Sequence, residues 1–199
     1  MPEARATRRR RRGGAPPAER TPAAATASTS QPHDSPATLV RAVVQRVRSA
    51  HVTVEGAEVG AIDGGLIAYV GVAVDDGDSD ASWIARKLAE LRLFASEDGR
   101  FDRSLADRVE AGEPSAALVI SQFTLLADIR KGRRPAFTQA APAERAEPLL
   151  EVVAGELRAR GVEVATGRFG SQMLVTSEND GPVTLWLDST IAVPRPGGD

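Results

Sequence analysis

The sequence predicts an α+β domain in which a mostly antiparallel sheet is packed by two main helices. Strand-like apolar stretches make up most of the predicted elements, and two amphipathic helical patterns lie well apart between them. The chain has 199 residues, of which 42% are apolar and 26% charged. This length and composition are typical of a single globular domain that buries its own core.

The first predicted strands follow Val40, where the apolar pattern begins. Residues 41–56 read RAVVQRVRSAHVTVEG, with valines at positions typical of two strand segments. Glycines punctuate the sequence after them. Residues 66–74, LIAYVGVAV, form a continuous apolar run and are the next predicted strand.

A first helix is predicted over residues 79–94, SDASWIARKLAELRLF. Ile84, Leu88 and Leu91 recur at the i, i+4 and i+7 spacing of one buried helical face. The candidates for its N-cap are three polar residues, Asp78, Ser79 and Asp80.

The second half of the chain holds another predicted strand, a second helix and two closing strands. Residues 116–127, AALVISQFTLLA, have strand character, and a basic loop follows them. A second helix is predicted over 143–160, with Pro148 either kinking it or marking its effective first turn. Two strands close the pattern, near 162–166 and 171–187, and a Gly-Pro pair breaks the second of them.

The chain therefore divides into a domain over residues 40–188 and two flanking segments. Residues 1–39 are rich in Arg, Ala, Pro, Ser and Thr and are predicted to be a disordered extension, because they cannot bury enough apolar surface to offset their ordering entropy. Its run Arg8–Arg12 has a weak tether to nucleic acid or a membrane surface as one interpretation, but we interpret the extension as dispensable. Residues 189–199 are expected to be a loose tail.

Charge is unevenly distributed between these parts. Residues 1–38 hold seven arginines and three acidic residues, a balance of +4, while the whole chain carries −2. The remaining residues 39–199 therefore carry −6. An acidic body has to contact nucleic acid through local basic patches rather than through a general field.

Most catalytic and metal-binding machinery is absent from the sequence. There is no cysteine, and the motifs of α/β-hydrolases, zinc proteases, P-loop proteins and dinucleotide-binding folds do not occur. The two histidines are His33, in the predicted extension, and His51, in a predicted strand. We interpret His51 as a satisfied or solvated side chain, and we expect no metal and no organic cofactor.

The stretch NDGPVT, residues 179–184, has two interpretations. Asn-Asp-Gly-Pro is strong turn chemistry, and a simple turn is the plainer of the two. Alternatively, a ligand contacts bare backbone at this corner, since proline interrupts otherwise good strand sequence. The local residues leave both interpretations open.

Four stretches together resemble the D-aminoacyl-tRNA deacylase family, of the D-tyrosyl-tRNA deacylase type. They are RAVVQRV (41–47), VISQFTL (119–125) with the basic loop KGRRPAF (131–137), GRFGSQM (167–173) and NDGPVT (179–184). The members of that family are homodimeric proofreading esterases that free tRNA from D-amino acids. The resemblance implies a barrel-like sheet, a homodimer and a cytoplasmic location. It also leads us to expect that residues 1–39 lie upstream of a natural start at Val40.

The resemblance gives the Gly-Pro corner a role. It implies that the Gly181–Pro182 bond is cis, that the pair reaches into the active site of the other subunit, and that Arg46 holds the motif in place. Main chain beside the chiral carbon would admit glycine or a D-amino acid and collide with an L-side chain. Without the resemblance, Arg46 is interpreted as a solvated charge at a strand edge.

The resemblance also assigns the SQFTL stretch, which is otherwise a buried strand ending in a turn. Ser121 and Gln122 are expected to provide backbone N–H groups for an oxyanion. Phe123 is expected to line the pocket of the terminal adenosine. Thr124 is the candidate nucleophile, but no base lies near it in the sequence. We therefore favour water positioned by the substrate's ribose 2′-OH.

A basic patch is the last candidate site. Its residues, which the resemblance assigns to tRNA phosphate contacts, are Arg130, Lys131, Arg133 and Arg134. A solvated loop explains the patch equally well. The rival to an aminoacyl-tRNA hydrolase is a non-catalytic RNA-binding protein on the same fold.

Overall fold

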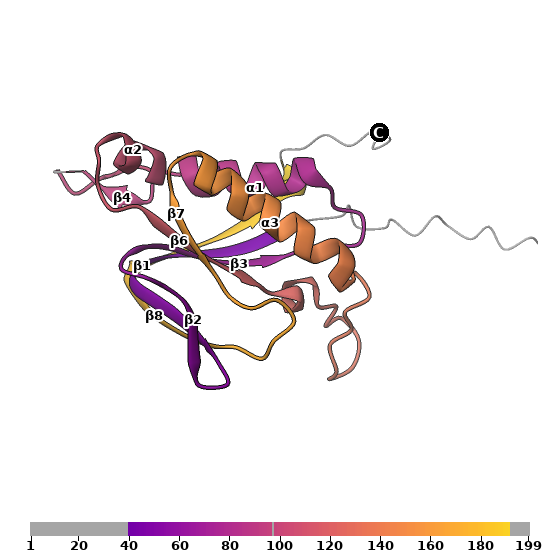
Figure 1. Ribbon diagram of the computed structural model, residues 1–199. Helices are drawn as coiled ribbons and strands as arrows, with labels where there is room; N and C mark the ends of the chain where they lie inside the picture. Colours follow the sequence, from indigo (N-terminus) through magenta and orange to yellow (C-terminus); the bar gives the residue numbers. More distant parts are fainter. Residues whose placement is uncertain (1–39, 97, 192–199) are drawn as a thin grey trace, which may run out of the picture. The chain divides into compact units, whose positions relative to one another are not determined.

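The structure is a computed structural model that describes residues 40–96 and 98–191. The predicted extension over 1–39 and the tail residues 192–199 lie outside the described residues. Within them the fold is α+β, as predicted, and α1 (Asp78–Glu90) and α3 (Ala143–Ala159) are the two main helices. Figure 1 shows both helices over one face of the sheet.

The described residues form one six-stranded sheet in the order β2-β1-β3-β6-β7, with β8 paired to β1. Its strands are β1 (Arg41–Val54), β2 (Ala57–Ile62), β3 (Gly65–Gly71), β6 (Ala116–Ser121), β7 (Glu163–Thr166) and β8 (Leu174–Asp188). The pairs of β1 with β2, β3 and β8 are antiparallel. The pairs β3–β6 and β6–β7 are parallel, so the sheet is mixed, although most of its pairs are antiparallel as predicted. The parallel pairs arise because helical segments connect these strands, as parallel crossovers require.

The sheet curls into a nearly closed barrel. Its two ends, β2 and β7, are in contact, and Gly60 of β2 faces the main chain of Thr166 in β7. A Cβ at position 60 would overlap the carbonyl of Thr166, so a glycine is required at this contact. The barrel-like sheet implied by the resemblance is therefore present.

Two cores lie on opposite sides of the central strands β3 and β6. Leu66, Ala68 and Val70 face the helices, while Ile67 lies in the cluster inside the barrel. Residues of β6 alternate in the same way, as the pleat of a strand requires. Burial on both faces explains why 66–74 reads as a continuous apolar run rather than an alternating one.

The long strand β1 corrects the prediction of two strand segments in residues 41–56. Its first half pairs with β3 and its second half with β2, while β8 follows its other edge. This pairing on both edges keeps all of Arg41–Val54 extended. A turn at Glu55 and Gly56 leads into β2.

Two helix boundaries differ from prediction. The N-cap of α1 is Gly77, and Asp80 accepts a hydrogen bond from its backbone N–H at 3.1 Å. The helix ends at Glu90 rather than at 94, because Leu91 has extended backbone and Phe94–Ala95 form β4, paired with β5 (Phe101–Arg103). The short helix α2 (Leu105–Glu110), which was not predicted, follows β5.

The ends of two predicted strands also differ. The strand predicted over 116–127 ends at Ser121 and continues as the 3-10 helix η1 (Phe123–Leu126). The predicted loose tail begins with the 3-10 helix η2 (Ser189–Ile191). Ser189 is buried, and its hydroxyl donates a hydrogen bond to Asp80. The second helix matches its prediction closely and continues through Pro148.

Candidate active site

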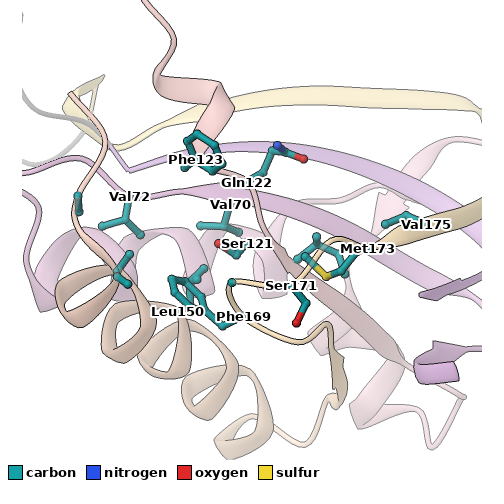
Figure 2. Close-up of a pocket in the computed structure, with 15 residues that line it drawn as sticks. Val70, Val72, Ser121, Gln122, Phe123, Leu150, Phe169, Ser171, Met173 and Val175 are labelled. Carbon is teal, nitrogen blue, oxygen red and sulfur yellow. The ribbon is translucent and has the colours of Figure 1, made fainter. Parts of the chain in front are cut away.

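A cavity of about 430 Å³ opens where the end of β6 meets α3 and the loop before β8. Val70 and Ser121 line it from the sheet, and Leu150 lines it from α3. Figure 2 shows Phe123 on one side of this space and Leu150 with Phe169 on the other. Three of the four residues of the SQFT motif thus lie on one wall: Ser121, Gln122 and Phe123.

The 3-10 turn η1 determines which amide groups face this region. The N–H of Gln122 donates to the carbonyl of Val70 at 2.8 Å, so it is engaged in the sheet and not available to an oxyanion. This corrects the expectation that Gln122 supplies such a donor. The N–H groups of Phe123 and Thr124 open the turn and have no acceptor within it.

Two residues outside the motif hold η1 against the sheet. Gly71, at the end of β3, leaves room for the turn, since a Cβ there would lie 2.7 Å from the carbonyl oxygen of Gln122. Arg41 donates from Nη1 to the carbonyl of Leu125 at 3.0 Å. Its guanidinium also lies 5.8 Å from the ring centroid of Trp186. Gly71 therefore lets η1 pack closely against β3, and Arg41 holds the C-terminal end of η1.

Within the described part of the chain, the candidate nucleophile Thr124 has no hydrogen-bonded base. Its Oγ1 accepts a hydrogen bond from the side-chain amide of Gln122. No histidine or carboxylate of residues 40–96 and 98–191 makes a hydrogen bond to it. His51 lies on β1, paired with Ala61 and Thr176, and takes no part in the cavity. The arrangement accordingly favours positioned water over an attacking threonine.

The Gly181–Pro182 corner is an excursion of β8. Its peptide bond is cis, as the resemblance implied. On either side of it β8 pairs with β1, Asn179 opposite Val47 and Thr184 opposite Gln45. Gly181 has φ +122°, a conformation that L side chains rarely adopt, and both corner residues are exposed. The corner presents main chain to solvent.

Side chains behind the corner fix its position. Asn179 donates from Nδ2 to the carbonyl of Arg46 at 2.9 Å and to that of Val183 at 3.1 Å. Nε of Arg46 lies 2.9 Å from Asp180 Oδ2, an ion pair without hydrogen-bond alignment. Its Nη1 donates to the carbonyl of Leu93 at 2.6 Å. The Arg46 side chain is only 11% exposed, so it is not the solvated edge charge that its position alone suggested.

The corner and the cavity of one chain do not meet. Ser121 pairs with Val70 at the level of Ala42, four residues along β1 from Arg46. That is about 13 Å along the strands, and β8 is three strand spacings of about 4.8 Å from β6. No residue of the corner lines the cavity. The predicted catalytic and selecting residues thus form two separate groups.

The basic patch lies on a hairpin between η1 and α3. Backbone hydrogen bonds between Asp128 and Ala136, at 2.7 and 3.0 Å, close the hairpin. Arg130 forms a two-pronged contact with the Asp128 carboxylate at 2.9 and 2.7 Å. Hydrogen bonds from Arg130 hold the pKa of Asp128 well below its usual range. All four basic residues of the patch are exposed, but Arg130 alone among them forms an ion pair within the described part of the chain.

Several site residues were not predicted from the sequence. Phe169 and Met173 line the cavity from within the quoted stretch 167–173, where an aromatic ring in a Gly-rich loop was the available signal. Arg41 and Gly71 carry no local signal, because their partners are distant in the sequence. Among the described residues no group of three His, Asp or Glu side chains is placed to hold a metal ion. No helix of that part of the chain is long and apolar enough to cross a membrane.

Two solved structures share the fold of this chain. A solved structure titled c-Myc DNA Unwinding Element Binding Protein is 36% identical, with a TM-score of 0.66 over 74% of this chain and 97% of that one. A structure of a probable eukaryotic D-amino acid tRNA deacylase has the same fold at 19% identity. Its TM-score is 0.65, over 75% of this chain and 99% of that one.

Similarity in sequence identifies the family of this chain. A D-aminoacyl-tRNA deacylase of Roseiflexus sp. (strain RS-1) is 57% identical over 152 residues, which are 76% of this chain and 95% of the relative. The family model of D-Tyr-tRNA(Tyr) deacylase matches residues 43–188. The chain belongs to the D-Tyr-tRNA(Tyr) deacylase family.

Proposed function

We propose that this protein hydrolyses the ester between a D-amino acid, or mischarged glycine, and the 3′ end of tRNA. The observation that carries the proposal is the exposed main chain of Gly181–Pro182, fixed from behind by Asn179 and Arg46. A rigid wall without a side chain discriminates by collision, which suits rejection of an L-amino acid. The membership of the chain in a family of this activity supports the same conclusion.

The reaction needs few side chains on this proposal. Water attacks the ester carbonyl, the bond to the ribose 3′ oxygen breaks, and the tRNA leaves with a free hydroxyl. The N–H groups of Phe123 and Thr124 stabilise the developing oxyanion at the start of η1. The substrate's neighbouring 2′-OH positions the water, since Thr124 has no base beside it. Ser121 and Phe123 line the cavity that receives the terminal adenosine.

The separation of corner and cavity supports a homodimer with shared sites. Each chain supplies a cavity and, on another part of the sheet, an exposed corner. In a two-fold dimer each surface meets its complement twice, so one corner can complete the partner's cavity. On this proposal the dimer proofreads tRNA in the cytoplasm.

A second candidate is a non-catalytic nucleic-acid-binding protein. It is favoured by the solved structure at 36% identity, whose title names a DNA unwinding element binding protein. A protein that only binds has no use for a fixed chiral wall. The two candidates therefore differ in what they require of Gly181.

The deciding experiment compares deacylation of D-Tyr-tRNA and L-Tyr-tRNA by the full chain and by Gly181→Ala. We expect hydrolysis of the D-substrate alone, and loss of at least about tenfold in the variant. A Cβ at 181 would meet Val183 Cγ2 at 2.8 Å and is strained at φ +122°. Binding of tRNA without hydrolysis of either substrate would favour the second candidate.

A further inference from the structure

Two aromatic rings are in contact beside the cavity, one on η1 and one directly after the hairpin. Phe123 and Phe137 lie with ring centroids 5.0 Å apart and planes at 71°, an edge-to-face pair. Phe123 is 53% exposed and Phe137 is 37% exposed, although aromatic rings are usually buried. Phe123 also lines the cavity. The pair therefore extends the apolar wall of the cavity onto the surface of the domain.

The hairpin is anchored where it leaves this wall. The N–H of Ala141 donates to the carbonyl of Val72 at 2.9 Å, and that of Val74 donates to Gln139 at 3.0 Å. The bridge between Asp128 and Ala136 closes the other end. Figure 1 shows the segment projecting from the domain between the end of β6 and the start of α3. Phe137 is thus held beside the cavity by main-chain contacts on both sides.

Positive charge is concentrated at the hairpin tip, beyond the ring pair. Lys131, Arg133 and Arg134 are exposed, and none of them forms an ion pair within the described part of the chain. Arg130 is excluded from this set by its contact with Asp128. Three cations gathered on an otherwise acidic body mark a local site for a polyanion.

We propose that Phe137 and the cations Lys131, Arg133 and Arg134 form a track for the unpaired 3′ end of a tRNA leading into the cavity. Exposed aromatic rings bind unpaired bases by stacking, and neighbouring cations contact the phosphates between them. With the terminal base against Phe123, the nucleotide before it stacks on Phe137. This assignment rests on the proposed function, because that function places the terminal adenosine in the cavity.

The test is binding of uncharged tRNA to the full chain, measured at several salt concentrations. Two tRNAs are compared, one complete and one lacking its unpaired terminal nucleotides. Phe137→Ala is expected to bind complete tRNA at least about fivefold more weakly, and to bind the truncated tRNA as the unaltered protein does. Ile129→Ala is the matched control, since Ile129 lies on the adjoining hairpin and is 72% exposed. It is expected to leave both affinities unchanged.

The salt dependence tests the cations separately. Each phosphate contact on a single strand contributes about −0.7 to the slope of log affinity against log salt concentration. The double change Arg133→Ala and Arg134→Ala is therefore expected to reduce the slope by about 1.4. Arg158→Ala removes a charge that is already paired with Glu151 and is expected to leave the slope unchanged.

Each outcome decides the proposal independently of turnover. An equal loss on both tRNAs, or no loss in Phe137→Ala, would overturn the track. Tighter binding of single-stranded DNA than of the RNA end would overturn the assignment to RNA. If the track variants behave as expected while D-Tyr-tRNA is not hydrolysed, the track stands and the proposed hydrolysis fails.

Discussion

Asn179 joins two main-chain carbonyls on either side of the Gly181–Pro182 corner, at Arg46 and Val183. The residues of the corner itself offer only backbone to a ligand, so the accuracy of the corner depends on such partners. Residues that contact no substrate are in this way expected to control selection.

Asn179→Ala is expected to lower the free energy of unfolding by about 1–3 kcal/mol, because it leaves two carbonyls without their donor. D-Tyr-tRNA turnover should fall by about tenfold or more as the corner loosens. Gln45→Ala is the matched control, since Gln45 also donates to β8, at Thr184, but in an exposed position. Urea denaturation and initial rates measure both effects, and equal behaviour of the two variants would contradict the role given to Asn179.

Gly71→Ala is expected to abolish most activity by displacing η1. The added Cβ would lie 2.5 Å from Leu126 Cδ2 and 2.7 Å from the main-chain oxygen of Gln122, and overpacking of this kind costs about 1–3 kcal/mol. Gly155→Ala in α3 meets no atom within 4 Å and should stabilise the protein by about 0.5–1 kcal/mol. The melting temperature should fall in Gly71→Ala and rise in Gly155→Ala, and only Gly71→Ala should lose turnover. A Gly71→Ala protein of full activity would show that η1 is not held by this contact.

At the scale of elements, α1 and α3 are joined by a polar contact on their outer side. Ser82 of α1 donates to Glu156 of α3, and Arg160 contacts the same carboxylate at 2.9 Å. The hydrogen bond from Ser82, aided by Arg160, lowers the pKa of Glu156. A carboxyl whose pKa is lowered in the folded state stabilises that state above its unfolded pKa. The stabilisation is lost as the pH falls through the folded pKa.

Ser82→Ala is therefore expected to cost about 1 kcal/mol at pH 7, and clearly less at pH 3. Ser79→Ala, on an exposed position of the same helix, should have an equally small effect at both values. Urea denaturation at the two pH values measures the difference. A cost in Ser82→Ala that does not change with pH would exclude the ionised Glu156 as its source.

The elements were predictable wherever local pattern decides the structure. Both main helices were predicted because a buried stripe repeats every 3.6 residues, as at Ile84 and Leu88 and within 143–160. The direction of β6 was not predictable, because parallel pairing depends on a partner strand far away in the sequence. The turn at Phe123 was missed for a similar reason: an apolar run continues through it, and only the space left by Gly71 allows it to bend.

In the candidate site, too, features set by local sequence were predictable and features set by distant contacts were not. Gly181 and Pro182 stand out in the sequence, and their cis bond was expected from the resemblance. The sequence did not predict that Arg46 is buried or that Asp128 pairs with Arg130. Both features depend on how side chains meet after folding. Spacing of charges along the chain predicts a patch but not which of its members is free.

At the scale of the whole molecule, the separation of corner and cavity gives a test of the proposed dimer. Gly181→Ala damages only the corner, and Phe123→Ala damages only the cavity wall. In mixed dimers one of the two sites combines an intact corner with an intact cavity. Random mixing of the two impaired proteins in equal amounts should therefore bring the activity to about a quarter of the unaltered value, above that of either variant alone.

The mixture is to be unfolded and refolded together, so that subunits exchange, and each variant refolded alone is the control. Recovery near a quarter supports sites shared between subunits. Activity no greater than that of the separate variants would mean that each chain completes its own site, against the proposal.

The cavity lies where the two cores of the domain meet, and its walls come from both. Val70 and Leu150 belong to the helix-facing core, while Ile120 and Met173 belong to the barrel interior. A small molecule that fills this space would tie the two layers together, and a ligand bound only by the folded state raises the melting temperature by mass action. Thermal shift screening of compound libraries is therefore a practical route to inhibitors of this protein, even without a charged tRNA in the assay.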